Sequence, residues 1–88
     1  MEPGQGGYPK RMPDGRLALT AGDGKILGYG RKAKCTKIRP GAPGAWISNE
    51  RCSYNFKLSD KYGSGWYACR GYGEGVAASC RRMKRPRR

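Results

Sequence analysis

The clearest pattern of hydrophobic and polar positions lies in the stretch "CSYNFKLS", residues 52–59. Apolar and polar residues alternate there over seven positions, and one face is formed by Cys52, Tyr54, Phe56 and Leu58. A period of two residues is typical of a half-buried β-strand. The pattern therefore predicts a strand here, with Tyr54 and Phe56 in the core.

Shorter apolar runs on both sides of this stretch indicate further strands. In "RLALTAGDGKILGYG", two such runs flank Gly22-Asp23-Gly24, which is a hairpin signal. Residues 40–44, "PGAPG", predict a loop, and "WYACRGYG" after the turn "DKYGSG" predicts another strand. The last apolar segment, "GVAASCRRMK", either begins a final helix or continues directly into the tail.

Together these signals predict an all-β fold. Five or six short strands with turns about every ten residues are typical of an antiparallel meander, which a chain with few apolar residues would curl into a sheet or small barrel. We expect a flexible, disordered Gly/Pro-rich arm over residues 1–15, a single small β domain over 16–80, and a basic tail over 81–88.

The composition makes the predicted core small. The 88 residues include only nine Ile, Leu, Val or Phe, and the net charge is +13. These values fall in the range of disordered chains. Two tryptophans and six tyrosines oppose that reading, since each ring buries a large apolar area. We therefore expect a folded middle held by aromatic residues, with Trp46 and Trp66 more readily placed in the core than on the surface.

The four cysteines leave several alternatives open. Cys35, Cys52 and Cys69 are each 17 residues apart, so neighbouring strands would bring them to similar heights, and Cys80 follows. Free buried thiols are slightly favoured, and two disulfides, with three possible pairings, are the main alternative. A metal site made of all four thiolates is a weaker hypothesis, because the usual closely spaced cysteine pairs and histidines are absent.

Positive charge is concentrated in two clusters, which point to an anionic partner. One cluster spans residues 31–39 and the other residues 81–88. Self-repulsion among like charges destabilises a compact chain, and a polyanion relieves it. Arginine, which dominates the second cluster, binds two phosphate oxygens with its planar fork. Nucleic acid, an anionic cell surface and an acidic protein surface are the candidate partners.

Aromatic rings interleaved with these cations favour nucleic acid. Bases stack on exposed rings while cations follow the phosphates. Tyr29 and Tyr72, each between two glycines, are the best surface rings, and Trp66 is a further candidate. The predicted interface consists of these three rings and thirteen cations, namely Arg31, Lys32, Lys34, Lys37, Arg39, Arg51, Arg70, Arg81, Arg82, Lys84, Arg85, Arg87 and Arg88.

Catalysis is not expected. The chain has no histidine and only six carboxylates, so the commonest general base is missing. Glycine-rich "GDGKILGYGRK" does not match a phosphate-binding loop, and turn glycines explain it. We therefore predict neither catalytic residues nor a cofactor.

Three functional hypotheses remain. The first is a small nucleic-acid-binding protein, for RNA or DNA, driven mainly by phosphate contacts and belonging to a virus, phage or ribonucleoprotein. The second is a secreted, disulfide-linked cationic protein that acts as a toxin, antimicrobial or cell-surface binder. The third is an inhibitor that docks on an acidic protein surface.

No segment is apolar for long enough to span a bilayer, and no secretory signal is evident, which favours an intracellular location. Oligomeric state is left open.

Overall fold

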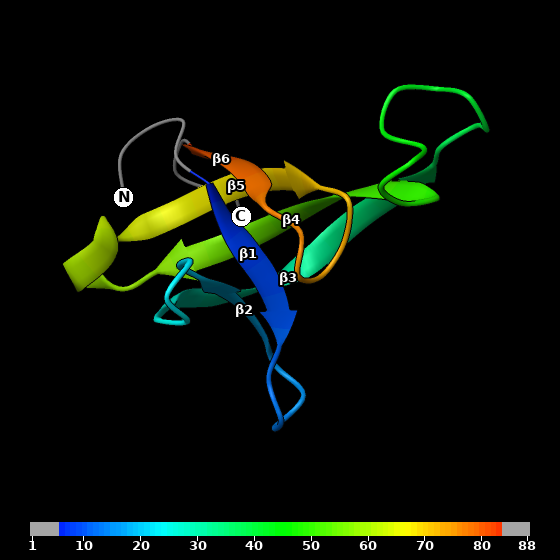
Figure 1. Ribbon diagram of the computed structural model, residues 1–88. Helices are drawn as coiled ribbons and strands as arrows, with labels where there is room; N and C mark the ends of the chain where they lie inside the picture. Colours follow the sequence, from blue (N-terminus) through cyan, green and yellow to red (C-terminus); the bar gives the residue numbers. More distant parts are fainter. Residues whose placement is uncertain (1–5, 84–88) are drawn as a thin grey trace.

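The structure, a computed structural model, describes residues 6–83. These residues form six β-strands and one short 3₁₀ helix, η1, at Asp60–Tyr62. The strands are β1 (Gly6–Arg11), β2 (Leu17–Thr20), β3 (Ile26–Lys37), β4 (Glu50–Leu58), β5 (Gly65–Gly71) and β6 (Ala78–Arg82). Each strand pairs antiparallel with the next, and β1 pairs with β6, so that the sheet closes into a barrel (Figure 1).

This architecture confirms the prediction of a small antiparallel barrel. The hairpin predicted around Gly22-Asp23-Gly24 joins β2 to β3, and the stretch with the cleanest alternation lies in β4. Residues 40–44 lie in turns between β3 and β4, as predicted. The segment "GVAASCRRMK", for which a helix was one alternative, contains strand β6 instead.

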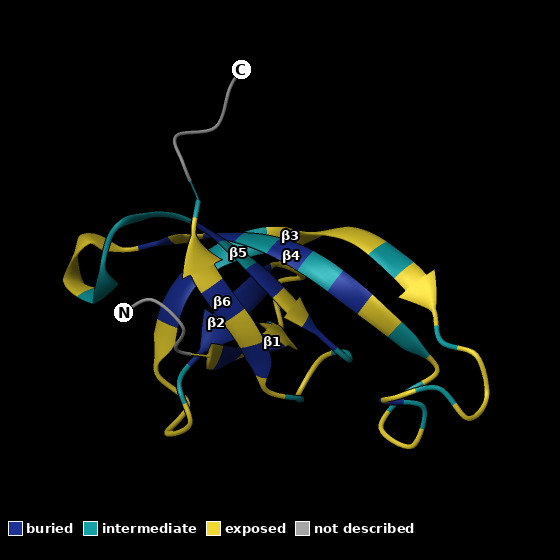
Figure 2. Ribbon diagram, turned by 90° about the horizontal axis from the view of Figure 1, so that it is seen from above, coloured by how far each residue is buried: buried dark blue, intermediate teal, exposed yellow. Residues whose placement is uncertain are grey.

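The inward-facing side chains explain why so few aliphatic residues are enough. Tyr54 and Phe56 of β4 are fully buried and lie side by side, with ring centroids 5.8 Å apart. Around them pack Tyr67 from β5 and leucines from β2, β3 and β4. Burial alternates along β4, as Figure 2 shows. The barrel is therefore filled by a few large rings, each of which removes much apolar area from water.

The flexible arm predicted over residues 1–15 is wrong for residues 6–11. These residues form β1, which pairs with β2 along its length and with β6 through Gly6 and Gly7. The buried positions of β1 are Gly7 and Pro9. Neither residue adds to an apolar pattern, so alternation gives no signal here, although backbone pairing is what closes the barrel. Residues 1–5 lie outside the described range.

The slight preference for free thiols is also wrong. Cys35 of β3 and Cys52 of β4 are directly opposite in the register and form a disulfide, and Cys69 of β5 and Cys80 of β6 form another. In both pairs the Cα atoms are 4.0 Å apart. Opposed cysteines in adjacent strands are already close enough to bond, which is why the register selects this pairing from the three that were open.

Two glycines allow the backbone of β3 to lie very close to that of its neighbour β4. A Cβ atom on Gly30 would meet the backbone carbonyl of Asn55, and one on Gly28 would meet that of Lys57. Both glycines face inward, where Gly28 pairs with Leu58 and Gly30 with Phe56. Their missing side chains leave the interior to the rings of β4.

We predict that Gly30→Ala destabilises the protein by about 1–3 kcal/mol, because backbone atoms must shift to accept the methyl group. Gly22→Ala is the matched control, since Gly22 lies in a turn with open space around its Cα. That control should change the free energy of unfolding by less than about 0.5 kcal/mol in chemical denaturation. Equal effects of the two substitutions would contradict the close approach.

A second prediction concerns the buried hydroxyl of Tyr54, which has no hydrogen-bond partner among the described residues. An unsatisfied buried hydroxyl costs free energy, so Tyr54→Phe should leave the free energy of unfolding unchanged or raise it by about 1 kcal/mol. Denaturation curves of the two proteins test this. A loss of more than about 1 kcal/mol would mean that the hydroxyl has a partner.

The same variant has a pH signature. Burial raises the pKa of the Tyr54 hydroxyl above its usual value of 10.0, and the carboxylates of Glu74 and Glu50 raise it further. The unfolded chain then ionises before the folded one, so stability falls as the pH rises past the unfolded value. Tyr54→Phe should lose less stability over that range than the unmodified protein.

Candidate nucleic-acid interface

The outward-facing side chains of β3 to β6 form a strongly positive surface of the described chain. We call this surface the cationic face, and its six exposed cations are Arg31, Lys34, Arg51, Lys57, Arg70 and Arg81. Those of β4 and β5 alternate with buried or half-buried residues, as the pleat of a strand requires. Glu50 is the only acidic residue in these four strands.

The register arranges these cations in rows across the strands. Lys34 and Arg70 flank Ser53 from the two neighbouring strands, so their backbones lie about 10 Å apart. In the next row, Arg31 pairs with Asn55, Asn55 pairs with Ala68, and Ala68 pairs with Arg81. Cations from segments as distant as residues 31 and 81 are thereby placed in one row that runs around the outside of the barrel from β3 to β6.

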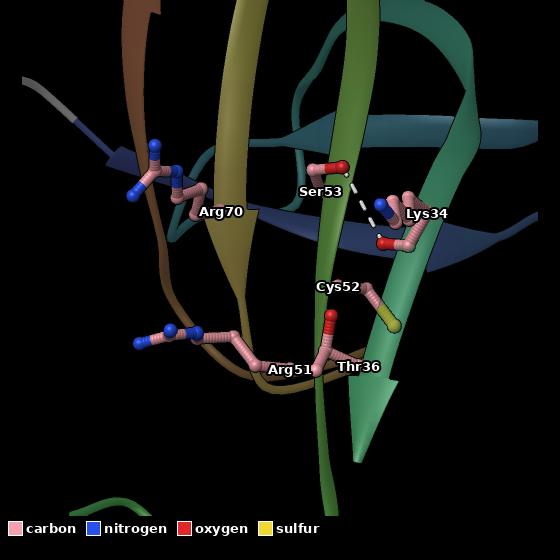
Figure 3. A pocket seen from close by; sticks show the side chains of 6 residues that line it. All are labelled: Lys34, Thr36, Arg51, Cys52, Ser53 and Arg70. Atoms are coloured by element: carbon pink, nitrogen blue, oxygen red, sulfur yellow. Dashed lines mark hydrogen bonds between the residues drawn. The ribbon is translucent and has the colours of Figure 1, made fainter. Parts of the chain in front are cut away.

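Small side chains between the cations leave two shallow hollows. The smaller, of about 150 Å³, is lined by residues of β3, β4 and β5 that include Lys34, Arg51 and Arg70. The larger, of about 520 Å³, lies over β4, β5 and β6 and shares Ser53 and Arg70 with the first. Figure 3 shows the guanidinium groups of Arg51 and Arg70 extending in the same direction beside the smaller hollow.

The cations of this face lack acidic partners within residues 6–83. The ion pairs there join Arg11 to Glu74, Arg16 to Asp14 and Lys25 to Asp23, all on β1 or in turns. The Arg16 backbone N–H and guanidinium also hold the pKa of Asp14 below its usual range. Acidic residues thus neutralise charge elsewhere and leave the face positive.

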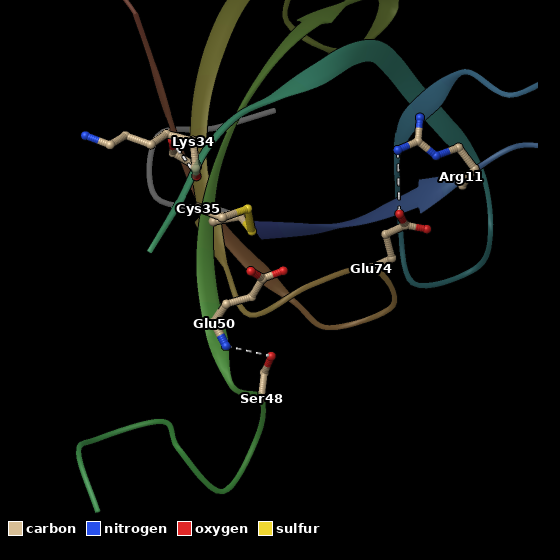
Figure 4. The surroundings of a disulfide bond; sticks show 8 residues. Arg11, Lys34, Cys35, Ser48, Glu50 and Glu74 are labelled. Carbon is tan, nitrogen blue, oxygen red and sulfur yellow. Dashed lines mark hydrogen bonds and ion pairs between the residues drawn. A yellow bond between two sulfur atoms is a disulfide. The ribbon is translucent and has the colours of Figure 1, made fainter. Parts of the chain in front are cut away.

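The cluster predicted at residues 31–39 is divided by the structure. A register shift between Lys32 and Lys34 puts Lys34 on the cationic face, whereas Lys32 and Lys37 pair with Tyr54 and Glu50, which occupy the inward positions of β4. Figure 4 shows Lys34 pointing away from the Cys35–Cys52 disulfide and from Glu50. Arg39 is exposed in the following loop.

The residues predicted as a basic tail, 81–88, do not all lie outside the barrel. Arg81 and Arg82 belong to β6, so the tail does not begin at residue 81. Arg82 donates hydrogen bonds to the carbonyl oxygen of Gly63 at 3.0 Å and to the hydroxyl of Tyr67 at 3.3 Å. It therefore closes one end of the barrel. The predicted site residues Lys84, Arg85, Arg87 and Arg88 lie outside the described residues.

The three predicted rings have different surroundings. Tyr29 and Trp66 lie at opposite sides of Lys57 in the register, and both are partly buried on the cationic face. The guanidinium of Arg16 lies 3.9 Å from the centroid of the Tyr29 ring, so one side of that ring is occupied. Tyr72 is not part of the row that contains Tyr29, Lys57 and Trp66. Its ring packs instead against the backbone of Gly44.

The sequence favours the core for both tryptophans, but Trp66 faces outward from β5, and a larger difference concerns Trp46. It was expected in the core, yet it is 87% exposed in the loop between β3 and β4. The neighbouring "PGAPGA" gives no periodicity that would assign Trp46 to a face. The loop composition was the available signal, since a tryptophan beside such turns is outside any strand.

A four-cysteine metal site is ruled out while both disulfides are intact, because no thiolate remains to bind a metal. Within residues 6–83, the ligand atoms of Cys35, Glu50 and Cys52 lie within 4.8 Å of one another, but two of the three are the sulfurs of one disulfide. The carboxylate of Glu50 alone provides too few ligand atoms to hold a metal ion.

Comparisons with protein-family models, with curated proteins and with solved structures found no match to this chain. In the part that the structure describes, there is no helix of the length and apolarity needed to cross a bilayer.

The unpaired charges give a stability prediction. Salt screens repulsion among exposed cations, so sodium chloride should raise the midpoint temperature of thermal unfolding. Arg70→Gln should weaken that salt dependence, because Arg70 shares a row with Lys34 and lies beside the row that holds Arg31 and Arg81. Lys10→Gln is the matched control, since Lys10 is exposed on β1, across the barrel from β4. Equal weakening in both variants would show that charge is not concentrated on this face.

Proposed function

We propose that this protein binds single-stranded nucleic acid along the cationic face. The observation that carries the proposal is the register, which places six cations from four strands on one surface without acidic partners among the described residues. An extended phosphate backbone crossing the strands would meet Arg31, Arg70 and Arg81 in succession. Binding costs less conformational entropy when the cations are already ordered on a sheet than when they lie on a mobile chain.

The rings at the edge of the face support single strands over double strands. The half-buried rings of Trp66 and Tyr29 flank Lys57, so a base that turns away from the phosphate backbone would meet aromatic surfaces beside a cation. Stacking contributes about 1–3 kcal/mol per base and does not depend on base identity. We therefore expect weak sequence preference.

This proposal is tested by titrating the full chain with short single- and double-stranded oligonucleotides over a salt series. Each cation that contacts a phosphate adds close to one unit to the logarithmic salt slope. Arg70→Gln and Arg81→Gln should each reduce the slope by about one and weaken binding of all sequences alike. Lys10→Gln should leave the slope almost unchanged. Failure of every oligonucleotide to bind at low salt would refute the proposal.

A second candidate function is favoured by the two disulfides. Disulfides persist in oxidising compartments and are rare in the cytosol, so they suit the secreted cationic protein of the second hypothesis. Its ligand would be an anionic cell-surface polymer bound by the same cations. Competition distinguishes the two functions: a polyanion without bases, such as heparin, would bind as tightly as oligonucleotides and would not quench Trp66.

A further inference from the structure

The hairpin of β3 and β4 extends beyond the barrel and ends in a loop (Figures 1 and 2). We call residues 38–49 the tip loop. Trp46 is 87% exposed there, and its neighbour Ile47 is 37% exposed. The core of this chain has few apolar residues, and an exposed tryptophan adds none of its large apolar area to it. Such an arrangement is typical of an interaction site.

Charge is distributed around this loop in a distinct way. Between Arg39 and Glu50 there is no charged residue, and the sequence consists of proline, glycine, alanine, Trp46, Ile47, serine and asparagine. Exposed cations lie at the base of the loop, at Lys37 and Arg39. The tip is therefore uncharged and partly apolar, and its base carries the two cations together with Glu50, which pairs with Lys37.

The tip loop is held by its own backbone and by the barrel. The N–H of Ile38 donates to Asn49 at 2.9 Å, and the N–H of Ile47 donates to Gly44 at 2.9 Å. Gly44 has a positive φ of 89° and lies against the Tyr72 ring, which leaves no space for a side chain there. Internal hydrogen bonds lower the cost of moving a loop into a medium that offers no water.

We propose that the tip loop is a lipid-binding site that inserts Trp46 and Ile47 into the interface of an anionic bilayer. Tryptophan favours the boundary between headgroups and acyl chains, and an adjacent aliphatic side chain adds apolar area to the insertion. Lys37 and Arg39 then face the lipid phosphates, where each cation near the surface adds to the attraction. This site is separate from the cationic face and does not depend on what that face binds.

A nucleic-acid base is a less suitable occupant of this tip. Stacking uses the indole alone and gives no role to Ile47 or to the uncharged stretch around it. The cations lie at the base of the loop, which fits phosphates positioned above an inserted apolar tip. The observations therefore favour a lipid surface.

The first test follows the fluorescence of Trp46. Trp46 and Trp66 are the two tryptophans, so Trp66→Phe leaves Trp46 as the sole reporter. Vesicles of phosphatidylcholine with phosphatidylserine should shift its emission to shorter wavelength, and brominated acyl chains should quench it. Vesicles of phosphatidylcholine alone should give a much smaller shift. Unchanged emission with the anionic vesicles would overturn the proposal.

The second test measures co-sedimentation with the same anionic vesicles and keeps Trp66 in place. Trp46→Ala should weaken vesicle binding about tenfold, which corresponds to loss of most of the inserted apolar area. Ile26→Ala is the matched control, because Ile26 is also about 38% exposed but begins β3, at the far end of the hairpin from the tip loop. Its binding should equal that of the unmodified protein.

Two results would overturn the assignment. Equal loss in Trp46→Ala and Ile26→Ala would show that the tip has no special role in vesicle binding. Quenching of Trp46 by an oligonucleotide, together with no response to vesicles, would assign the tip to nucleic acid instead. Because neither variant alters the cationic face, failure here leaves the salt-slope test of the proposed function unaffected.

Discussion

The antiparallel pairing of β3 with β4 is the constraint on which the rest of this structure depends. It runs from Gly28 opposite Leu58 to Lys37 opposite Glu50, the longest pairing of the barrel. A slip of one residue would turn every side chain to the other face and expose the rings of the core. The Cys35–Cys52 disulfide joins two directly opposed residues and so excludes that slip. The register thus determines at once what is buried and which charges are displayed.

The same register creates a conflict between stability and charge. Tyr54 and Phe56 face inward, so Asn55 and its neighbours in the row must face outward beside Arg31 and Arg81. Crowded cations repel one another and oppose folding. The disulfides offset this repulsion, since each typically contributes about 2–4 kcal/mol by restricting the unfolded chain. A bound polyanion would remove the repulsion, which links folding to the proposed binding.

Local patterns were sufficient to predict the fold class. Alternation identified β4 and its buried side chains, and turn residues identified the hairpin between β2 and β3. β1 gave no such signal, because its buried residues Gly7 and Pro9 carry little apolar surface and its role depends on backbone pairing with β6. Trp46 was placed in the core on composition alone, although the thin core does not need it.

The candidate site was only partly predictable for a related reason. Charge clustering drew attention to residues 31–39, but proximity in sequence does not fix the direction of a side chain. The register shift beside Ala33 separates Lys34 from Lys32, and Arg82 turns to the barrel end. The cysteine spacing of 17 residues matches the Cys35–Cys52 bond. Cys69 bonds to Cys80 instead, because β6 is its neighbour in the barrel.

We propose that the register of β3 to β6 creates an anion-binding surface. Amide chemical shifts of the full chain, recorded while a short single-stranded oligonucleotide is added, test this proposal. Changes should be concentrated at outward positions such as Asn55, Ala68 and Arg81, with β1 and β2 nearly unchanged. Changes spread evenly around the barrel, or centred on β1, would contradict it.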